Sequence, residues 1–181
     1  HFRQVAKICF PKAKIIADKY HVIRQVYWDM ERVRKNEQSK LSAHFRKYFK
    51  KSKNLLMKRT EKLTDDEKNR LSLMFETAPR LADAYRVKNE FLDVIRSKSS
   101  AEGRQKLIDW LFSVEVMDIP EFYNSTTACR NWFQEILNSM DVPWTNGYIE
   151  GCNNKTKVLK RVSYGIPNFE HLRKRILFCN T

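Results

Sequence analysis

The sequence predicts an α+β fold that is predominantly α-helical. A short apolar run, residues 13–17, ends abruptly at Asp18, which is typical of a buried strand with an acid at its carboxyl end. Elsewhere apolar residues recur at helical spacing. Only four glycines occur among 181 residues, and three of them follow residue 146, so few breaks interrupt the middle of the chain. We therefore expect one strand at the start and helices after it.

The amino-terminal helices follow from periodicity and capping signals. Residues 1–9 read as the end of a helix broken near Pro11, and residues 20–36 as a long helix. Capping-box patterns predict helix starts near residues 65 and 100, and a proline opens a helix over residues 81–95. The residues behind these expectations are Val22, Ile23, Val26, Met30 and Val33 as the inward face, Thr64 with Glu67, Ser99 with Glu102, and Pro79.

Three further helices are expected in the carboxyl-terminal third. Residues 119–140 form one, with Phe122, Trp132, Phe133, Ile136 and Leu137 as its core residues. Thr145 is the expected N-cap of the helix that carries Glu150, and Asn168 caps a last helix that runs to about Phe178.

The segment Asn146–Lys157 is the strongest candidate for a functional site, because it sets one carboxylate among amides and cations. In a helix, three-and-four spacing separates its residues into two faces. The polar face holds Glu150, Asn153, Asn154, Lys157 and Arg161, and the packing face holds Ile149, Cys152, Thr156 and Leu159. The bland alternative is an ordinary amphipathic surface helix.

Asp18 is a second candidate with an equally simple alternative. In open α/β sheets ligands gather beyond the carboxyl ends of strands, so this carboxylate is well placed to hold a metal ion. It could equally be the N-cap of the following helix and accept a backbone N–H from Tyr20 or His21. His21 lies one helical turn further on, either as a surface histidine or as a group that orients Asp18 or touches a bound substrate.

Two motifs together resemble a known family. The order I-I-A-D-K-Y-H-V, residues 15–22, precedes a long helical interval and then N-G-Y-I-E-G-C-N-N-K-T-K-V-L-K-R-V-S-Y-G-I-P-N-F-E-H-L-R-K-R-I-L, residues 146–177. This order is similar to the carboxy-terminal catalytic part of bacterial insertion-sequence transposases of the DDE class, ISL3 type. The resemblance is carried by residues 11–23 and 145–178.

The resemblance implies a partial RNase-H-like fold in which three carboxylates hold two divalent metal ions, Mg²⁺ or Mn²⁺. Asp18 matches the second Asp of the family and Glu150 its closing Glu. Residues 1–17 contain no acid that could match the first Asp, so a catalytic fragment is expected. The implied domains are part of the catalytic core in residues 1–37, a helical insertion in 38–141, and the core with the Glu helix in 142–181.

The implied reaction is DNA strand cleavage and strand transfer. A water, and later a 3′-hydroxyl, attacks phosphorus in line, and paired metal ions stabilise the attacking and leaving oxygens. Mg²⁺ prefers oxygen ligands, which explains Asp and Glu. Residues expected to contact DNA phosphates beside the metals are Asn153, Asn154, Lys157, Lys160 and Arg161.

The composition agrees with a polyanionic partner. Thirty-five Lys and Arg against 21 Asp and Glu give a formal charge of +14, and the pI is about 9.7. The densest basic run is residues 44–62, in which Arg46, Lys47, Lys50 and Lys51 are expected DNA contacts. The aromatic residues within it, Phe45, Tyr48 and Phe49, fit a packed helical stripe better than base-stacking platforms.

Other features limit the function class. No apolar run reaches the roughly 18 residues of a membrane span. The four cysteines lie far apart with no C-x-x-C pair, so we expect buried free thiols and neither a zinc site nor a disulfide framework. A cytoplasmic, nucleoid-associated protein without membrane contact is expected, and its full-length form should pair transposon ends and target DNA as a homodimer or higher synaptic complex.

Trp144 either closes the insertion against the core or stacks an unpaired base. The competing hypothesis is a non-catalytic helical nucleic-acid-binding module.

Overall fold

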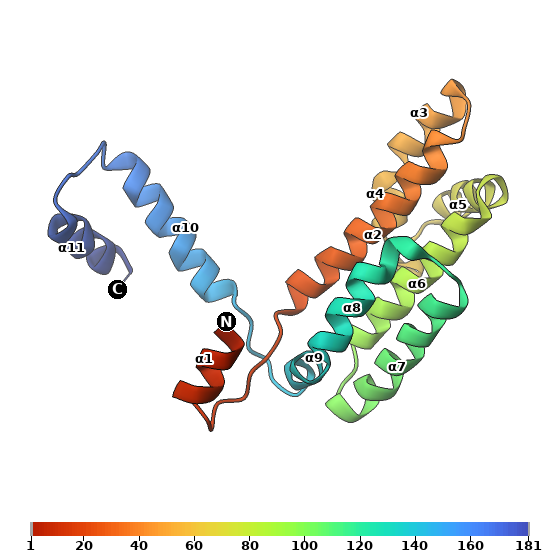
Figure 1. The fold of residues 1–181 in the computed structure, drawn as a ribbon. Helices are drawn as coiled ribbons and strands as arrows, with labels where there is room; N and C mark the ends of the chain where they lie inside the picture. Colours follow the sequence, from red (N-terminus) through yellow and green to blue (C-terminus); the bar gives the residue numbers. More distant parts are fainter. Residues whose placement is uncertain (1, 181) are drawn as a thin grey trace. The chain divides into compact units, whose positions relative to one another are not determined.

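The computed structural model describes residues 2–180 and divides into two compact units, one ending at Pro143 and one starting at Trp144 (Figure 1). Each unit is built from helices. The first unit holds α1 (Phe2–Cys9), α2 (Lys19–Ser39), α3 (Ala43–Lys51), α4 (Lys53–Met57), η1 (Thr60–Lys62), α5 (Asp65–Thr77), α6 (Pro79–Ile95), α7 (Ser100–Val116), η2 (Pro120–Phe122), α8 (Tyr123–Asn131) and α9 (Phe133–Met140). The second unit holds α10 (Gly147–Val162) and α11 (Phe169–Asn180).

The core of the first unit lies between α2, α6, α7 and α8, which run side by side in Figure 1. On α2 the predicted inward residues Val26, Met30 and Val33 are fully buried. Trp110 of α7 is buried against Phe91 of α6, with ring centroids 4.8 Å apart. Each such side chain stabilises the fold by roughly 1.5–3 kcal/mol through removal of apolar surface from water.

The predicted helix starts are confirmed at residues 64 and 99. Thr64 accepts the backbone N–H of Glu67 at 3.3 Å, and the Glu67 carboxylate accepts that of Thr64 at 3.1 Å, which completes a capping box. Ser99 accepts the N–H of Glu102, whose own side chain reaches Lys98 rather than Ser99. Local sequence therefore sets these two boundaries.

The strand expected to end at Asp18 is absent, since none of residues 2–180 is in a β-strand. Residues 13–18 are extended, but a strand needs a neighbouring strand, and here helix α9 takes its place. The backbone N–H of Ala17 donates to the carbonyl of Glu135 at 2.9 Å, and the carbonyl of Ile15 accepts from Asn138 at 2.8 Å. The described part of the chain is thus predominantly α-helical, as predicted, and only the strand of the predicted α+β class is not found in residues 2–180.

The helix expected over residues 119–140 is divided into η2, α8 and α9. The chain leaves helical geometry at Trp132, where ψ is 23°, and α9 starts in a new direction. Phe122, Ile136 and Leu137 are buried as predicted, but Trp132 is 41% exposed and is not a core residue. Apolar periodicity across residues 122–137 therefore predicted the core better than it predicted helix continuity.

The second unit is a helical hairpin with little buried surface. No described side chain of α10 is fully buried, although Cys152, Thr156 and Leu159 of the predicted packing face are half-buried. Ile149 of the same predicted face is 53% exposed. Asn168 caps α11 as predicted, because its side chain accepts the N–H groups of Glu170 and His171 at 2.9 and 3.3 Å.

Two expectations about cysteines and membranes can be compared with these helices. Cys129 is buried, but Cys9 is exposed and Cys152 and Cys179 are half-buried, so burial of all four thiols was wrong. Among the described helices, none has both the length and the apolar character required to cross a bilayer.

Candidate active site

Asp18 ends the extended segment and begins α2. Its Oδ1 accepts the backbone N–H of Tyr20 at 2.9 Å, so the N-cap alternative is confirmed. This cap occupies one carboxylate oxygen and fixes the direction of the side chain. Oδ2 is the oxygen that could ligate a cation, so capping and metal binding are compatible at this residue.

A hollow of about 370 Å³ lies beside Asp18 within the first unit. His21 and Gln25, on successive turns of α2, line it together with Asp18, and Trp132 and Ile136 contribute apolar walls. Carboxylate, imidazole and amide groups thus meet at one rim, where they could ligate a cation or accept hydrogen bonds from a ligand. Gln25 and Trp132 carry no local sequence signal for this position, because the hollow forms only when α8 and α9 fold back onto α2.

Glu150 lies in the first turn of α10, in the second unit. The helix begins at Gly147 with Asn146 as its N-cap, so Thr145 is not the N-cap that the sequence predicted. The Thr145 hydroxyl still accepts the backbone N–H of Gly147 at 3.3 Å. Gly147 is the first residue of the helix, whereas an N-cap side chain bonds the N–H of the second or third helical residue. A carboxylate in a first turn interacts favourably with the positive end of the helix dipole.

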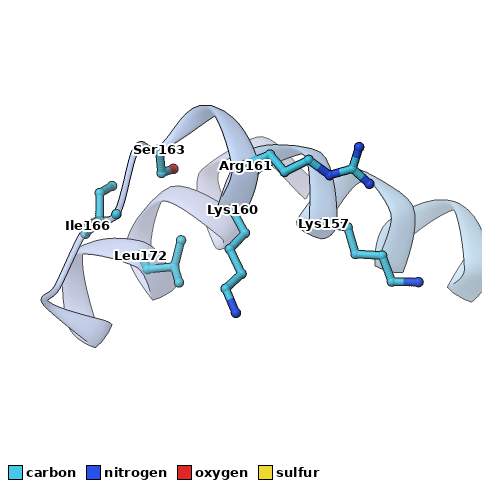
Figure 2. Close-up of a pocket in the computed structure, with 7 residues that line it drawn as sticks. Lys157, Lys160, Arg161, Ser163, Ile166 and Leu172 are labelled. Atoms are coloured by element: carbon cyan, nitrogen blue, oxygen red, sulfur yellow. The ribbon is translucent and has the colours of Figure 1, made fainter.

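Apart from Glu150, the predicted polar face of α10 is exposed. Glu150 is half-buried, whereas Asn153, Asn154, Lys157, Lys160 and Arg161 are exposed. Figure 2 shows the last three extending from α10 at a hollow of about 520 Å³ that Ile166 and Leu172 also line. A positive rim around an apolar floor suits a phosphate-bearing ligand.

The DNA contacts predicted in the basic run of residues 44–62 lie on α3, in the first unit. Lys47, Lys50 and Lys51 are exposed on it. Arg46 is also exposed, and its guanidinium donates to the carbonyls of Leu41 and Ser39 at 2.9 and 2.7 Å, so it closes the end of α2 as well.

The aromatic residues of α3 follow the packed-stripe interpretation only in part. Phe49 is buried, Tyr48 is half-buried, and Phe45 is 47% exposed.

Trp144, in the second unit, is 69% exposed. Its side chain therefore presents ring surface to solvent.

Two buried groups outside the candidate site have displaced pKa values. Burial raises the pKa of Asp29 to about 6, although hydrogen bonds from Ser125 and Arg32 oppose the effect. Burial likewise lowers the pKa of Lys88 to about 7, and its ammonium donates to the carbonyls of Leu56 and Lys58 at 3.0 and 2.6 Å. Both groups hold helices together in the core, which is a structural role.

Comparison with known proteins identifies a family and several curated relatives. A family profile described as a transposase, of the DDE class and ISL3 type, matches residues 1–176. The transposase for insertion sequence element IS1001 of Bordetella parapertussis is 26% identical over 170 residues, 92% of this chain and 42% of that protein. The transposase for IS1557 of Mycobacterium tuberculosis is 28% identical over 138 residues, 76% of this chain and 31% of that protein. The chain thus spans less than half the length of these curated relatives. No solved structure matches it significantly.

Proposed function

Because the chain belongs to the ISL3-type transposase family, we propose that it supplies part of a catalytic domain that cleaves DNA at transposon ends and joins the ends to target DNA. The observation that carries this proposal is the extent of the family match. It covers residues 1–176 and therefore includes both candidate acids, Asp18 and Glu150. The alternative of a non-catalytic binding module has no comparable support.

We propose that Asp18 and Glu150 hold divalent metal ions, Mg²⁺ or Mn²⁺, two in the complete site. The donor chemistry fits, because both are carboxylates, and the cap at Asp18 engages Oδ1 but not Oδ2. Bound ions would activate the attacking oxygen and neutralise charge on the leaving oxygen. His21, on the rim of the hollow with Asp18, would orient that carboxylate or contact the scissile phosphate.

The cations and amides of α10 would seat the DNA backbone. Asn153, Asn154, Lys157, Lys160 and Arg161 are proposed to bind phosphates, which positions the strand without reading its sequence. The exposed Trp144 is proposed to stack on an unpaired base. On α3 the proposed backbone contacts are Arg46, Lys47, Lys50 and Lys51.

The wider architecture is part of the same proposal. Residues 1–37 and 142–181 would belong to an RNase-H-like core, with 38–141 as its helical insertion, in a cytoplasmic, nucleoid-associated protein that acts as a dimer or higher synaptic complex. Since residues 1–17 contain no acid, the 181-residue chain by itself should bind DNA in a salt-dependent manner without efficient cleavage. Robust nicking by this chain would contradict the assignment of an essential acid elsewhere.

A metal titration tests the assignment of Glu150. In a form of the protein as long as its curated relatives, Mn²⁺ binding measured by calorimetry should weaken at least tenfold in Glu150→Gln. Glu170→Gln is the matched control, since Glu170 is an exposed carboxylate in the same unit. Equal Mn²⁺ affinity in the two variants would remove Glu150 from the proposed site.

A further inference from the structure

One face of α2 carries exposed or half-buried residues along nearly its full length. Tyr20, Arg24, Trp28 and Lys35 follow one another at intervals of four, four and seven residues, which places them on one side of the helix. Tyr20 is 60% and Trp28 54% exposed, and Lys35 is also exposed. We call these four residues the outer face of α2. The inward residues of the same helix lie on the opposite side, so packing in the core does not explain this face.

The end of the outer face nearest Asp18 holds a fixed cation. The Arg24 guanidinium lies 5.5 Å from the Tyr20 ring and 4.9 Å from the Trp28 ring, and a nitrogen of it lies 3.2 Å from Nδ1 of His21. Two rings on either side hold a guanidinium by cation–π attraction and limit its rotamers. A pre-positioned cation loses less conformational entropy when it binds an anion than a free lysine does.

The far end of the outer face opens into a basic hollow of about 420 Å³ between α2 and α3. Lys35, Arg46 and Lys50 are the exposed cations of this distal hollow. The bonds from Arg46 to two carbonyls at the end of α2 fix its guanidinium there. The acid Glu31 lies between Trp28 and Lys35 on the same side of α2, where it pairs with the buried Arg34 at 2.7 Å and interacts electrostatically with Lys35. Arg46 and Lys50 on α3 add further positive charge to the hollow.

The two ends are separated by a length that the helix defines. Lys35 follows Asp18 by 17 positions, and at a rise of 1.5 Å per residue this separation is about 25 Å. Successive phosphates of B-DNA advance about 3.4 Å along the axis, so this length corresponds to roughly seven base pairs. We propose that the outer face of α2 is a track for the duplex that flanks the cleavage site. It contacts backbone phosphates through Arg24, near the Asp18 end, and through Lys35, Arg46 and Lys50, about seven base pairs from Asp18.

The track rests on the proposed function, because that function makes Asp18 the reference point for the cleaved bond.

The positive charge of the track determines which kind of ligand binds to it. The chain carries a net charge of +14, and the two ends of the face hold four cations, so a polyanion with evenly repeated charges fits both ends at once. An acidic protein segment would meet the charge but not the regular spacing.

DNA binding by the 181-residue chain tests the track. Fluorescence anisotropy in EDTA would compare labelled DNA hairpins with stems of about 3, 8 and 12 base pairs, because Arg24 and Lys35 are 11 positions apart and the helix between them spans about 16 Å, or roughly five base pairs. The variant Lys35→Ala/Lys50→Ala removes two exposed charges of the distal hollow, and Lys68→Ala/Lys98→Ala removes two exposed charges elsewhere. On the longer stems we expect the first variant to bind at least tenfold more weakly and to lower the slope of log K against log salt by about 2, since each phosphate contact contributes about 0.9. The control should change affinity less than threefold.

Stem length separates a track from general basicity. On the shortest stem, which cannot reach from Arg24 to the distal hollow, the two double variants should bind alike. Equal weakening by both variants on every stem would overturn the track, as would preferential binding of an acidic peptide over the longer stems. Neither outcome bears on the metal assignment, because EDTA removes metal from the assay and Glu150 is tested separately.

Discussion

Asp29 provides the sharpest stability prediction. Its side chain is 2% exposed and accepts hydrogen bonds from Ser125 on α8 and Arg32 on α2, and burial raises its pKa from 3.8 to about 6. The folded state therefore favours the protonated carboxyl. The stability that this preference contributes is fully present below about pH 3.8 and is lost as the pH rises through about 6. The difference between these two pKa values corresponds to about 3 kcal/mol.

The variant Asp29→Asn resembles the protonated carboxyl and does not titrate. We expect its free energy of unfolding to gain about 2.4 kcal/mol relative to the wild type between pH 4 and pH 8, since part of the ~3 kcal/mol is already lost at pH 4. Urea unfolding followed by the fluorescence of the buried Trp110 would measure this in the first unit. Asp65→Asn is the control, because pairing with Lys68 lowers the Asp65 pKa and the relative stability should shift in the opposite direction. Parallel pH curves for wild type and Asp29→Asn would refute the reasoning.

Three further predictions follow from the packing of the first unit. Because burial lowers the Lys88 pKa to about 7, wild-type stability should rise as the pH increases from 7 towards 10.5, and Lys88→Met should lose that rise in urea unfolding at each pH. A Cβ at Gly103 would meet Sδ and Cε of Met140, the far end of a flexible side chain that can shift, so this strain should roughly offset the gain in helix propensity, and Gly103→Ala should change the free energy of unfolding by less than about 1 kcal/mol; a loss above about 2 kcal/mol in thermal or urea unfolding would contradict it. Thr64→Ala removes the α5 cap and should cost about 1 kcal/mol, and a matching Ser42→Ala change should cost less, since Ser42 makes no side-chain cap bond.

Local sequence predicted the features that depend on local physics. The capping box at Thr64, the cap at Asn168 and the inward residues of α2 each require only a few neighbouring residues, and the structure confirms them. The cap at Asp18 belongs to the same class. Features that need a distant partner were predicted less well. Residues 13–17 have strand character, but their backbone groups bond to Glu135 and Asn138, more than one hundred residues away.

In the candidate site too, features set by neighbouring residues were predicted and features that depend on distant parts of the chain were not. The residue types around Glu150 were sufficient to predict a polar, exposed helix face and to identify the family. The hollow beside Asp18 could not be predicted, because Trp132 reaches it only after the break between α8 and α9 turns the chain. Helical periodicity could have revealed the outer face of α2, since Tyr20, Arg24, Trp28 and Lys35 share one side of a helix that was predicted correctly.

The central claim is that Asp18 and Glu150 act in one metal-dependent DNA reaction. Its most direct test is cleavage of a labelled transposon end by a protein of the length of the curated relatives, with Mg²⁺ or Mn²⁺. We predict that Asp18→Asn and Glu150→Gln each lower strand cleavage at least a thousandfold, or about 4 kcal/mol in activation free energy, while end binding in EDTA changes less than threefold. Cleavage at the wild-type rate by either variant would contradict the account.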